Sequence, residues 1–134
     1  MIWRVRRRHE FERLRRDGVR IRPEVGDQIV NRSLWSQVIV EASDTPPRLG
    51  FAIGRAVGTA VVRNRLRRRL RAAFDALAER GAMVSGHYVV MASPAAVELT
   101  FDQLSAAAAS ICDQAAHLTP QHPLSAAAER GAAS

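Results

Sequence analysis

The sequence has a single cysteine, few aromatic residues, no lysine and no long apolar run. Cys112 is the only cysteine among 134 residues, so an intramolecular disulfide and a site built from several cysteines are both excluded. No apolar run approaches the roughly 18 residues that a membrane-spanning helix needs. The N-terminal residues are basic, but no apolar stretch typical of a signal peptide follows them. We therefore expect a soluble, cytoplasmic protein with no membrane partner.

Acidic residues are scarce in the first half of the chain. All 20 basic residues are arginine, and the formal net charge is +7. Residues 1–71 contain 18 arginines and 7 acidic residues, whereas residues 72–134 contain 2 arginines and 6 acidic residues. A guanidinium group is planar, permanently charged and suited to bidentate phosphate contacts. The charge therefore indicates a polyanionic partner that meets the N-terminal half.

The residue patterns predict one mixed α/β domain over residues 1–118 and a flexible, alanine-rich tail over residues 119–134. Runs of β-branched and apolar residues predict strands at residues 34–42, 48–53 and 87–92, with a possible short strand at 19–21. The stretch that continues to Arg32 contains Pro23 and Gly26, and we interpret it as a loop.

Three helices are predicted, at residues 7–16, 60–80 and 100–116. The first is amphipathic, with Phe11 and Leu14 on one face. Thr59 is placed to cap the start of the second helix and Gly81 to end it. Thr100 and Gln103 have the spacing of a capping box at the start of the third. The second helix then connects two neighbouring strands.

The most informative segment is the arginine-rich part of residues 60–80. At about 100° per residue, its apolar side chains share one stripe of the helix. The other side collects six arginines and an asparagine, namely Arg63, Asn64, Arg65, Arg67, Arg68, Arg69 and Arg71. A solvated helix face is the alternative interpretation, but such faces usually mix acids with bases. No acidic residue lies between Thr45 and Phe74, so we interpret this side as a phosphate-binding surface.

The order of motifs around this helix resembles the ribonuclease P protein family. Residues 48–74, RLGFAIGRAVGTAVVRNRLRRRLRAAF, contain a glycine-bearing strand, Gly-x-Ala-Val and then Arg-Asn-Arg-x-Arg-Arg-x-x-Arg. The similarity extends over about residues 4–116. It implies an α/β sandwich in the order α-β-β-β-α-β-α, with a four-stranded mixed sheet and a left-handed β-α-β crossover. The residue pattern alone would favour a right-handed crossover.

The resemblance also implies a function, as the RNA-binding subunit of the enzyme that removes the 5′ leader from precursor tRNA. Six residues of the arginine-rich helix would bind the catalytic RNA: Arg63, Asn64, Arg65, Arg67, Arg68 and Arg71. A cleft between the first helix and the sheet would hold the single-stranded leader, with Phe11 and Tyr88 stacking on bases and Arg55 contacting the backbone. Ordinary core packing is the alternative for Phe11 and Tyr88. Arg15 replaces a second aromatic residue that is usual on the first helix.

No pattern indicates an active site in the protein itself. The four histidines, His9, His87, His117 and His122, lack metal-ligand spacing, and Cys112 has no evident triad partner. The resemblance places hydrolysis in the RNA subunit with bound Mg²⁺. We therefore expect no catalytic residue, no bound cofactor and no small-molecule substrate in the protein. Its partners would be the catalytic RNA and the precursor tRNA leader.

Charge alone leaves other functions open. A ribosomal protein would have a similar excess of basic over acidic residues. So would a DNA-binding regulator that uses residues 60–80 as its recognition helix. Such a regulator would usually need a helix-turn-helix neighbour and a route to dimerisation, whereas strands flank this helix. A nuclease that acts without RNA is the third alternative.

Overall fold

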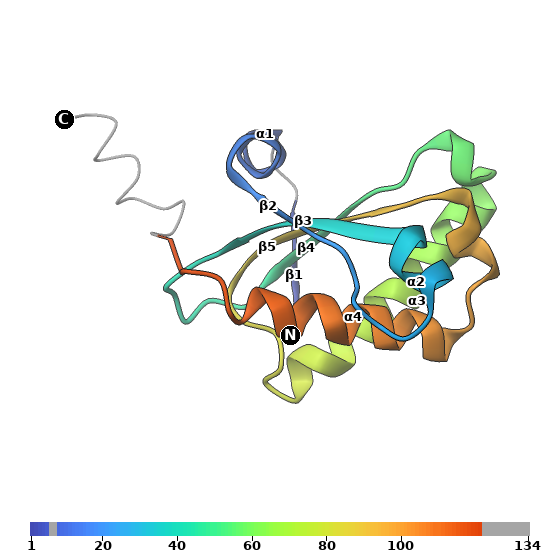
Figure 1. Ribbon diagram of the computed structural model, residues 1–134. Coiled ribbons are helices and arrows are strands. Elements are labelled where there is room, and N and C mark those ends of the chain that lie inside the picture. The colour runs from blue at the N-terminus through green and yellow to red at the C-terminus, as the bar shows by residue number, and fades with distance from the viewer. Residues whose placement is uncertain (6–7, 122–134) are drawn as a thin grey trace.

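A five-stranded mixed sheet carries helices on both of its faces (Figure 1). The computed structural model describes residues 1–5 and 8–121. In chain order the elements are β1 (Trp3–Arg4), α1 (Arg8–Asp17), β2 (Val19–Ile21), α2 (Gln28–Ser33), β3 (Leu34–Val40), β4 (Arg48–Ala52), the 3-10 helix η1 (Arg55–Val57), α3 (Ala60–Glu79), β5 (Gly86–Ala92), the 3-10 helix η2 (Pro94–Glu98) and α4 (Phe101–Ala115). Within these ranges no helix has the length and apolar character that crossing a bilayer requires.

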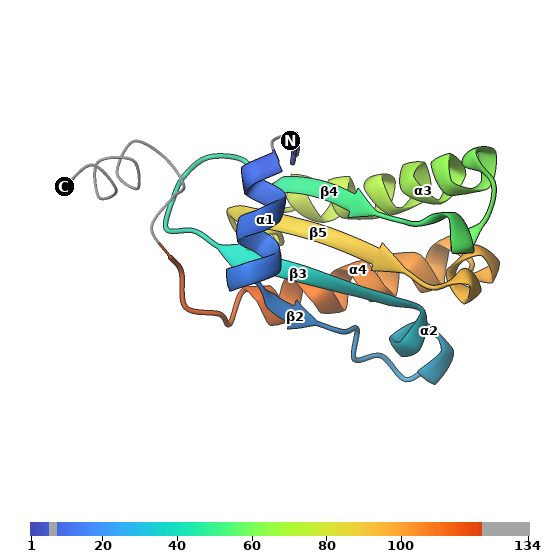
Figure 2. The same cartoon turned by 90° about the horizontal axis from the view of Figure 1, so that it is seen from above.

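The strands lie in the order β1-β4-β5-β3-β2. β4 is parallel to β5, with Gly50 opposite Val89, and β3 is antiparallel to β5, with Gln37 opposite Val89. In Figure 2 both β4 and β5 point to the right, β4 lies above β5, and α3 joins them behind the sheet. That arrangement is a left-handed crossover, the hand that is rare among such units and that the family resemblance implies.

The two faces of the sheet bury cores of different size. The larger core lies between the sheet and the helices α3 and α4, where Leu66 and Leu70 of α3 are buried with Val38, Val90 and Leu104. On the opposite face α1 crosses the strands (Figure 2) over a small cluster formed by Val5, Leu14, Ile39 and Val89, with Phe11 packed against it. Because successive residues of a strand face opposite sides, β5 directs Val89 toward α1 and its neighbours Tyr88 and Val90 toward the larger core.

The predicted helix ends are confirmed where a cap defines them. The hydroxyl of Thr59 accepts a hydrogen bond from the backbone N–H of Val62, and Gly81 adopts a φ of +72° directly after the last turn of α3. At the start of α4 the side chains of Thr100 and Gln103 each accept from the other's backbone N–H. This reciprocal pair is the predicted capping box.

Two elements differ from the sequence-based expectation. α2 lies in the segment interpreted as a loop, where Asp27 caps its first turn by accepting from Ile29 N–H at 2.9 Å. A helix of six residues is too short to show a periodic pattern, and burial of Val30 in the large core stabilises it. β1 adds a fifth strand, pairing Trp3 with Arg48. The expected four strands and three helices are therefore corrected to five strands and four α-helices within the described residues.

The end of the described chain returns to the sheet. Gln121 donates its backbone N–H to the Val40 carbonyl at 2.7 Å, and its own carbonyl accepts from Ala42 N–H at 2.9 Å. The predicted flexible tail over 119–134 thus begins with residues bound beside the end of β3. Its remainder, residues 122–134, lies outside the described residues, as does residue 7 of the first predicted helix.

Candidate nucleic-acid interface

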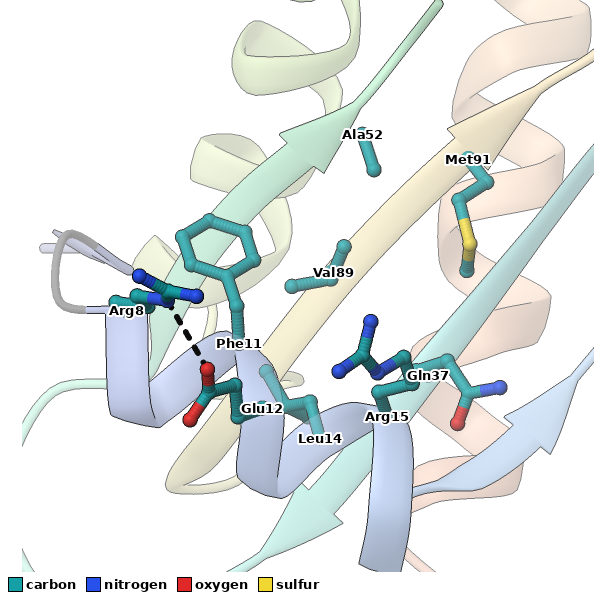
Figure 3. Close-up of a pocket in the computed structure, with 9 residues that line it drawn as sticks. All are labelled: Arg8, Phe11, Glu12, Leu14, Arg15, Gln37, Ala52, Val89 and Met91. Atoms are coloured by element: carbon teal, nitrogen blue, oxygen red, sulfur yellow. Dashed lines mark hydrogen bonds and ion pairs between the residues drawn. The ribbon is translucent and has the colours of Figure 1, made fainter.

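A cleft of about 410 Å³ separates α1 from the sheet (Figure 3). Its floor consists of side chains that β3, β4 and β5 direct to one face of the sheet, namely Gln37, Ala52, Val89 and Met91. Its wall is the inner side of α1, with Arg8, Phe11, Glu12, Leu14 and Arg15. In Figure 3, Phe11 and Arg15 point from α1 over this floor. A mainly apolar floor beside an arginine-bearing wall suits a nucleotide, because the base needs apolar contact and the phosphate needs a cation.

Phe11 lies in the cleft and also packs against the small cluster under α1. Its ring approaches β4 closely because residue 50 is glycine. A Cβ atom at Gly50 would lie 3.3 Å from Cζ of Phe11 and 3.0 Å from Cβ of Val5, which is tighter than ordinary contact. Phe11 thus packs against the small cluster and also lines the cleft, and its stacking on a base stays a prediction.

Tyr88 does not line the cleft, and its expected position there is wrong. The side chain faces the opposite side of the sheet and is fully buried in the larger core. Its hydroxyl donates to the Val84 carbonyl at 2.7 Å. Burial, together with the nearby Cys112, raises the pKa of Tyr88 above its usual value. Core packing is thus the correct interpretation, and Val89, one residue later, lies under α1 instead.

Arg55 is exposed in η1, after the end of β4, and is not among the residues that line the cleft. The cations of the cleft come from α1. Arg8 forms an exposed ion pair with Glu12 at 3.0 Å, whereas Arg15 forms no ion pair with a carboxylate of the described residues. Arg8 and Arg15 line the cleft and Arg55 does not, so these two residues are better placed for the expected contact with the leader backbone.

Sequence reasoning missed Trp35, which lies on the same face of the sheet as the cleft floor. Trp35 is half-buried on β3, opposite Met91. The guanidinium groups of Arg20 and Arg22 lie 5.6 and 5.3 Å from its ring centre. Its alternation with Gln37 along β3 was the available signal, but it became informative only once the cleft face was known.

Most of the arginines of α3 line one of two different hollows. Asn64, Arg67, Arg68 and Arg71 line a second hollow of about 540 Å³, together with Arg4, Phe11 and residues of β4. Arg65 and Arg69 lie on the other side, against η2, where Arg69 donates to the Leu99 carbonyl at 3.0 Å. Arg63 is half-buried, and its Nε atom has no hydrogen-bond partner among the described residues. The predicted RNA-binding set thus includes a ridge, formed by Asn64, Arg67, Arg68 and Arg71, that lines the second hollow, and Arg65, which lines the hollow against η2.

The charge of the ridge beside the second hollow is not neutralised within the described protein. No arginine from Arg63 to Arg71 forms an ion pair with a carboxylate of the described residues. Arg67 donates to the Asn64 side chain at 2.7 Å, and Arg71 lies 5.5 Å from the Phe51 ring centre. Burial and the charge of Arg4 lower the pKa of Arg71, an effect that Asp75 partly offsets. A bound polyanion would relieve this repulsion.

Phe11 lies between the cleft and the second hollow, because it lines both of them. The cleft therefore adjoins the hollow lined by Asn64, Arg67, Arg68 and Arg71.

Buried charges hold α1 in place above the sheet. Glu10 accepts from Arg48 at 2.8 Å, and Glu41 accepts from Arg13 at 3.2 Å. His87 lies between the two carboxylates, with Nδ1 2.9 Å from Glu41 and Nε2 4.0 Å from Glu10. Ions withdrawn from water are stable only in good paired geometry, so this cluster restricts where α1 can lie. Because α1 is one wall of the cleft, the position that this cluster gives to α1 sets the width of the cleft.

The comparisons with known proteins agree with this geometry. A family model described as Ribonuclease P matches residues 2–116. Among solved structures, the chain is similar to the RNase P protein of Staphylococcus aureus, with 20% identity and a TM-score of 0.68 over 84% of this chain and 94% of that chain. It is also similar to the RNase P protein of Thermotoga maritima, with 22% identity and a TM-score of 0.67 over 83% and 96% of the two chains. A search of curated proteins finds no match. Because the family match contains α1, the cleft strands and all of α3, the chain belongs to the ribonuclease P protein family, the protein subunit of the enzyme that processes the 5′ end of tRNA.

Proposed function

We propose that this chain binds the catalytic RNA of ribonuclease P along α3 and the single-stranded 5′ leader of precursor tRNA in the cleft beside α1. The observation that carries this proposal is the position of Phe11, whose ring lines both the cleft and the arginine-lined hollow. One protein surface of this shape can hold two RNA segments next to each other.

The cleft is suited to an unpaired strand. Phe11 offers an aromatic ring to a base, and stacking of this kind contributes about 1–3 kcal/mol per base. Arg15, on the same helix, has no carboxylate partner among the described residues and is available to a phosphate. Trp35, with Arg20 and Arg22 beside it, extends this face beyond Met91. A paired RNA helix would not expose its bases to these rings.

The ridge on α3 is suited to a phosphate backbone. Arg67, Arg68 and Arg71 lie on one side of one helix, and neutral Asn64 adds a donor and an acceptor. Guanidinium groups bind phosphate oxygens in pairs, and each contact releases counterions from the RNA. Binding therefore removes the like-charge repulsion that α3 carries in the free protein.

We assign the chemical step to the RNA subunit. The described residues hold no group of three or more His, Cys, Asp or Glu side chains suited to a metal ion. The Mg²⁺ that activates water for phosphodiester hydrolysis would then be held by RNA ligands. This chain would bind the two RNAs, orient the leader and reduce the repulsion between two polyanions.

Reconstituted cleavage tests the proposal. Removal of the 5′ leader from a precursor tRNA is measured at low Mg²⁺ with bacterial ribonuclease P RNA alone, with the intact protein, and with an Arg67→Ala/Arg68→Ala variant. The matched control is Arg32→Ala/Arg80→Ala, which removes the same charge at exposed positions outside the cleft and the hollows. We expect the intact protein and the control to restore cleavage, and the α3 variant to need more than about tenfold more protein.

Three results would count against the proposal. Cleavage without any RNA subunit would indicate a nuclease that acts alone. Binding to the RNA without stimulated cleavage would favour a ribosomal or DNA-binding role. Equal activity of the two double variants would show that total charge matters and the α3 ridge does not.

A further inference from the structure

An exposed tryptophan lies at the β1 edge of the sheet, above a further hollow, of whose residues the proposed function uses only Arg71. Trp3 keeps 40% of its surface exposed, although it pairs with Arg48 in the sheet. The Arg48 guanidinium lies 5.3 Å from the centre of its ring. The hollow has a volume of about 590 Å³ and is lined by Ile2, Trp3, Arg4, Glu10, Arg48, Arg71 and Asp75. The exposed part of this large amphipathic ring is accessible to a binding partner.

The charges around Trp3 favour an anion on one side of the ring. Glu10 is engaged by Arg48 at 2.8 Å, and Asp75 acts on Arg71. Arg4 is exposed and forms no ion pair with a carboxylate of the described residues. The uncompensated positive charge at this edge therefore lies at Arg4, next to Trp3 along the chain.

The edge is continuous with the arginine ridge of α3. Arg4 and Arg71 line the hollow beneath Trp3 and also the second hollow, where Arg67 and Arg68 lie. Three binding surfaces thus follow one another across the molecule, first the cleft, then the second hollow, then the Trp3 edge. Phe11 lines the first two, and Arg4 and Arg71 line the last two.

We propose that Trp3, Arg4 and Arg71 form a binding site for one unpaired nucleotide of RNA, whose base stacks on Trp3 and whose phosphate binds between the two arginines. The inference rests on the proposed function, because that function makes RNA the partner, and it adds a contact site that the function does not require. A cation on one face of an indole ring is compatible with stacking on the exposed part of the ring. The nucleotide comes either from the leader or from the catalytic RNA.

Tryptophan fluorescence reads this site directly. The chain has two tryptophans, Trp3 and Trp35, so a Trp35→Phe protein reports Trp3 alone and keeps an aromatic ring at residue 35. It is titrated separately with a ten-nucleotide single-stranded leader RNA, with bacterial ribonuclease P RNA and with polyglutamate, while filter binding measures complex formation. We expect the emission of Trp3 to fall by about half with one of the two RNAs, which identifies the source of the nucleotide, and to stay constant with polyglutamate.

Affinity of the otherwise native chain provides a second measurement. Trp3→Ala should weaken binding of the RNA that quenches Trp3 by about 5-fold to 150-fold, whereas Trp3→Phe should weaken it less than about 3-fold. Unchanged Trp3 emission with both RNAs at saturation, equal quenching by polyglutamate, or equal affinity of Trp3→Ala and the native chain would each overturn the site. Stimulated cleavage of precursor tRNA with any of these results would leave the proposed function intact. Quenching of Trp3 by RNA without stimulated cleavage would support the Trp3 site and count against the proposed function.

Discussion

At the scale of single residues, the face of a strand on which a side chain lies decides what it can do. Tyr88 and Val89 are neighbours in the chain, yet Tyr88 is buried beneath the sheet and Val89 lies in the cleft. Gly50 also lies on the face of the sheet that meets α1, and a side chain at this position would crowd the ring of Phe11. The position of the Phe11 ring in the cleft thus requires a glycine at residue 50 of β4.

Phe11→Leu tests the stacking role of this ring while largely preserving its packing volume. We expect the affinity for a precursor tRNA with a single-stranded leader to fall by about 5-fold to 150-fold, because a leucine cannot stack on a base. The affinity for mature tRNA, which has no leader, should stay within about 2-fold. Equilibrium binding to the reconstituted holoenzyme measures both. Phe11→Tyr should behave as the native chain, and equal losses with the two tRNAs would contradict the stacking role.

The buried groups Cys112 and Tyr88 predict lower stability at alkaline pH. Burial raises the pKa of the Cys112 thiol from a usual 9.0 to about 12, and it raises the pKa of Tyr88 as well. The folded state keeps protons that the unfolded state loses, so their contribution is complete below about pH 9 and is lost as the pH rises. The free energy of unfolding should fall by up to about 1.4 kcal/mol per pH unit for each group.

Urea unfolding at pH 7.5, 9.0 and 10.5 measures this slope. Cys112→Ala removes the contribution of the thiol to this slope, so the free energy of unfolding of the variant should fall less steeply with pH than that of the native chain. Parallel pH profiles for the two proteins would show that the thiol does not contribute.

At the scale of elements, α1 is held both by a small apolar cluster and by buried charges. Its apolar contacts belong to a cluster of four buried residues, whereas α3 and α4 share the large core. Glu10 contributes the buried carboxylate that meets Arg48 and His87. The wall of the cleft therefore depends on ion pairs, and losing one partner leaves an uncompensated buried charge.

Glu10→Ala should lower the free energy of unfolding by about 2 kcal/mol, since a buried charged hydrogen bond is lost. Glu12→Ala is the matched control, because it removes the same side chain from the same helix. Its ion pair with Arg8 is largely exposed, and such pairs contribute at most about 0.5–1 kcal/mol. Urea unfolding of the two variants gives the comparison. Equal losses would mean that the buried cluster does not anchor α1.

At the scale of the whole molecule, charge is distributed for association with RNA. Eighteen of the 20 arginines lie within residues 1–71, and folding places Arg67, Arg68 and Arg71 of α3 beside the hollow that adjoins the cleft. Association should therefore weaken steeply as salt rises, because phosphate contacts release counterions.

Arg67→Ala/Arg68→Ala should reduce the slope of log K against log salt by about 2, because each arginine that no longer binds a phosphate lowers the slope by about one unit. The Arg32→Ala/Arg80→Ala control, with the same net charge, should keep a slope close to that of the native chain. Filter binding of ribonuclease P RNA between about 50 and about 400 mM salt, a range that spans physiological ionic strength, measures the slopes. Identical slopes for the two variants would indicate a general charge effect.

Local rules were sufficient where the relevant interactions lie close together in the chain. The caps of α3 and α4 each depend on residues three positions apart, such as Thr100 and Gln103. The same rules failed for α2, whose six residues depend on burial against distant elements, and for β1, whose two residues form a strand only because β4 lies beside them. Short elements obtain their stability from tertiary contacts.

The sequence by itself determined the arginine-rich face of residues 60–80, the caps that bound that helix and the motif order that resembles the family. Each depends on residue identity at short spacing. Only the tertiary structure decided that Tyr88 lies beneath the sheet, that Arg65 and Arg69 line a different hollow from Arg67 and Arg68, and that Phe11 lines both the cleft and the arginine-lined hollow. These positions follow from strand register, from the left-handed crossover that sets α3 beneath the sheet, and from the buried ions that hold α1 above it. Such interactions join residues far apart in the chain, and no local pattern contains them.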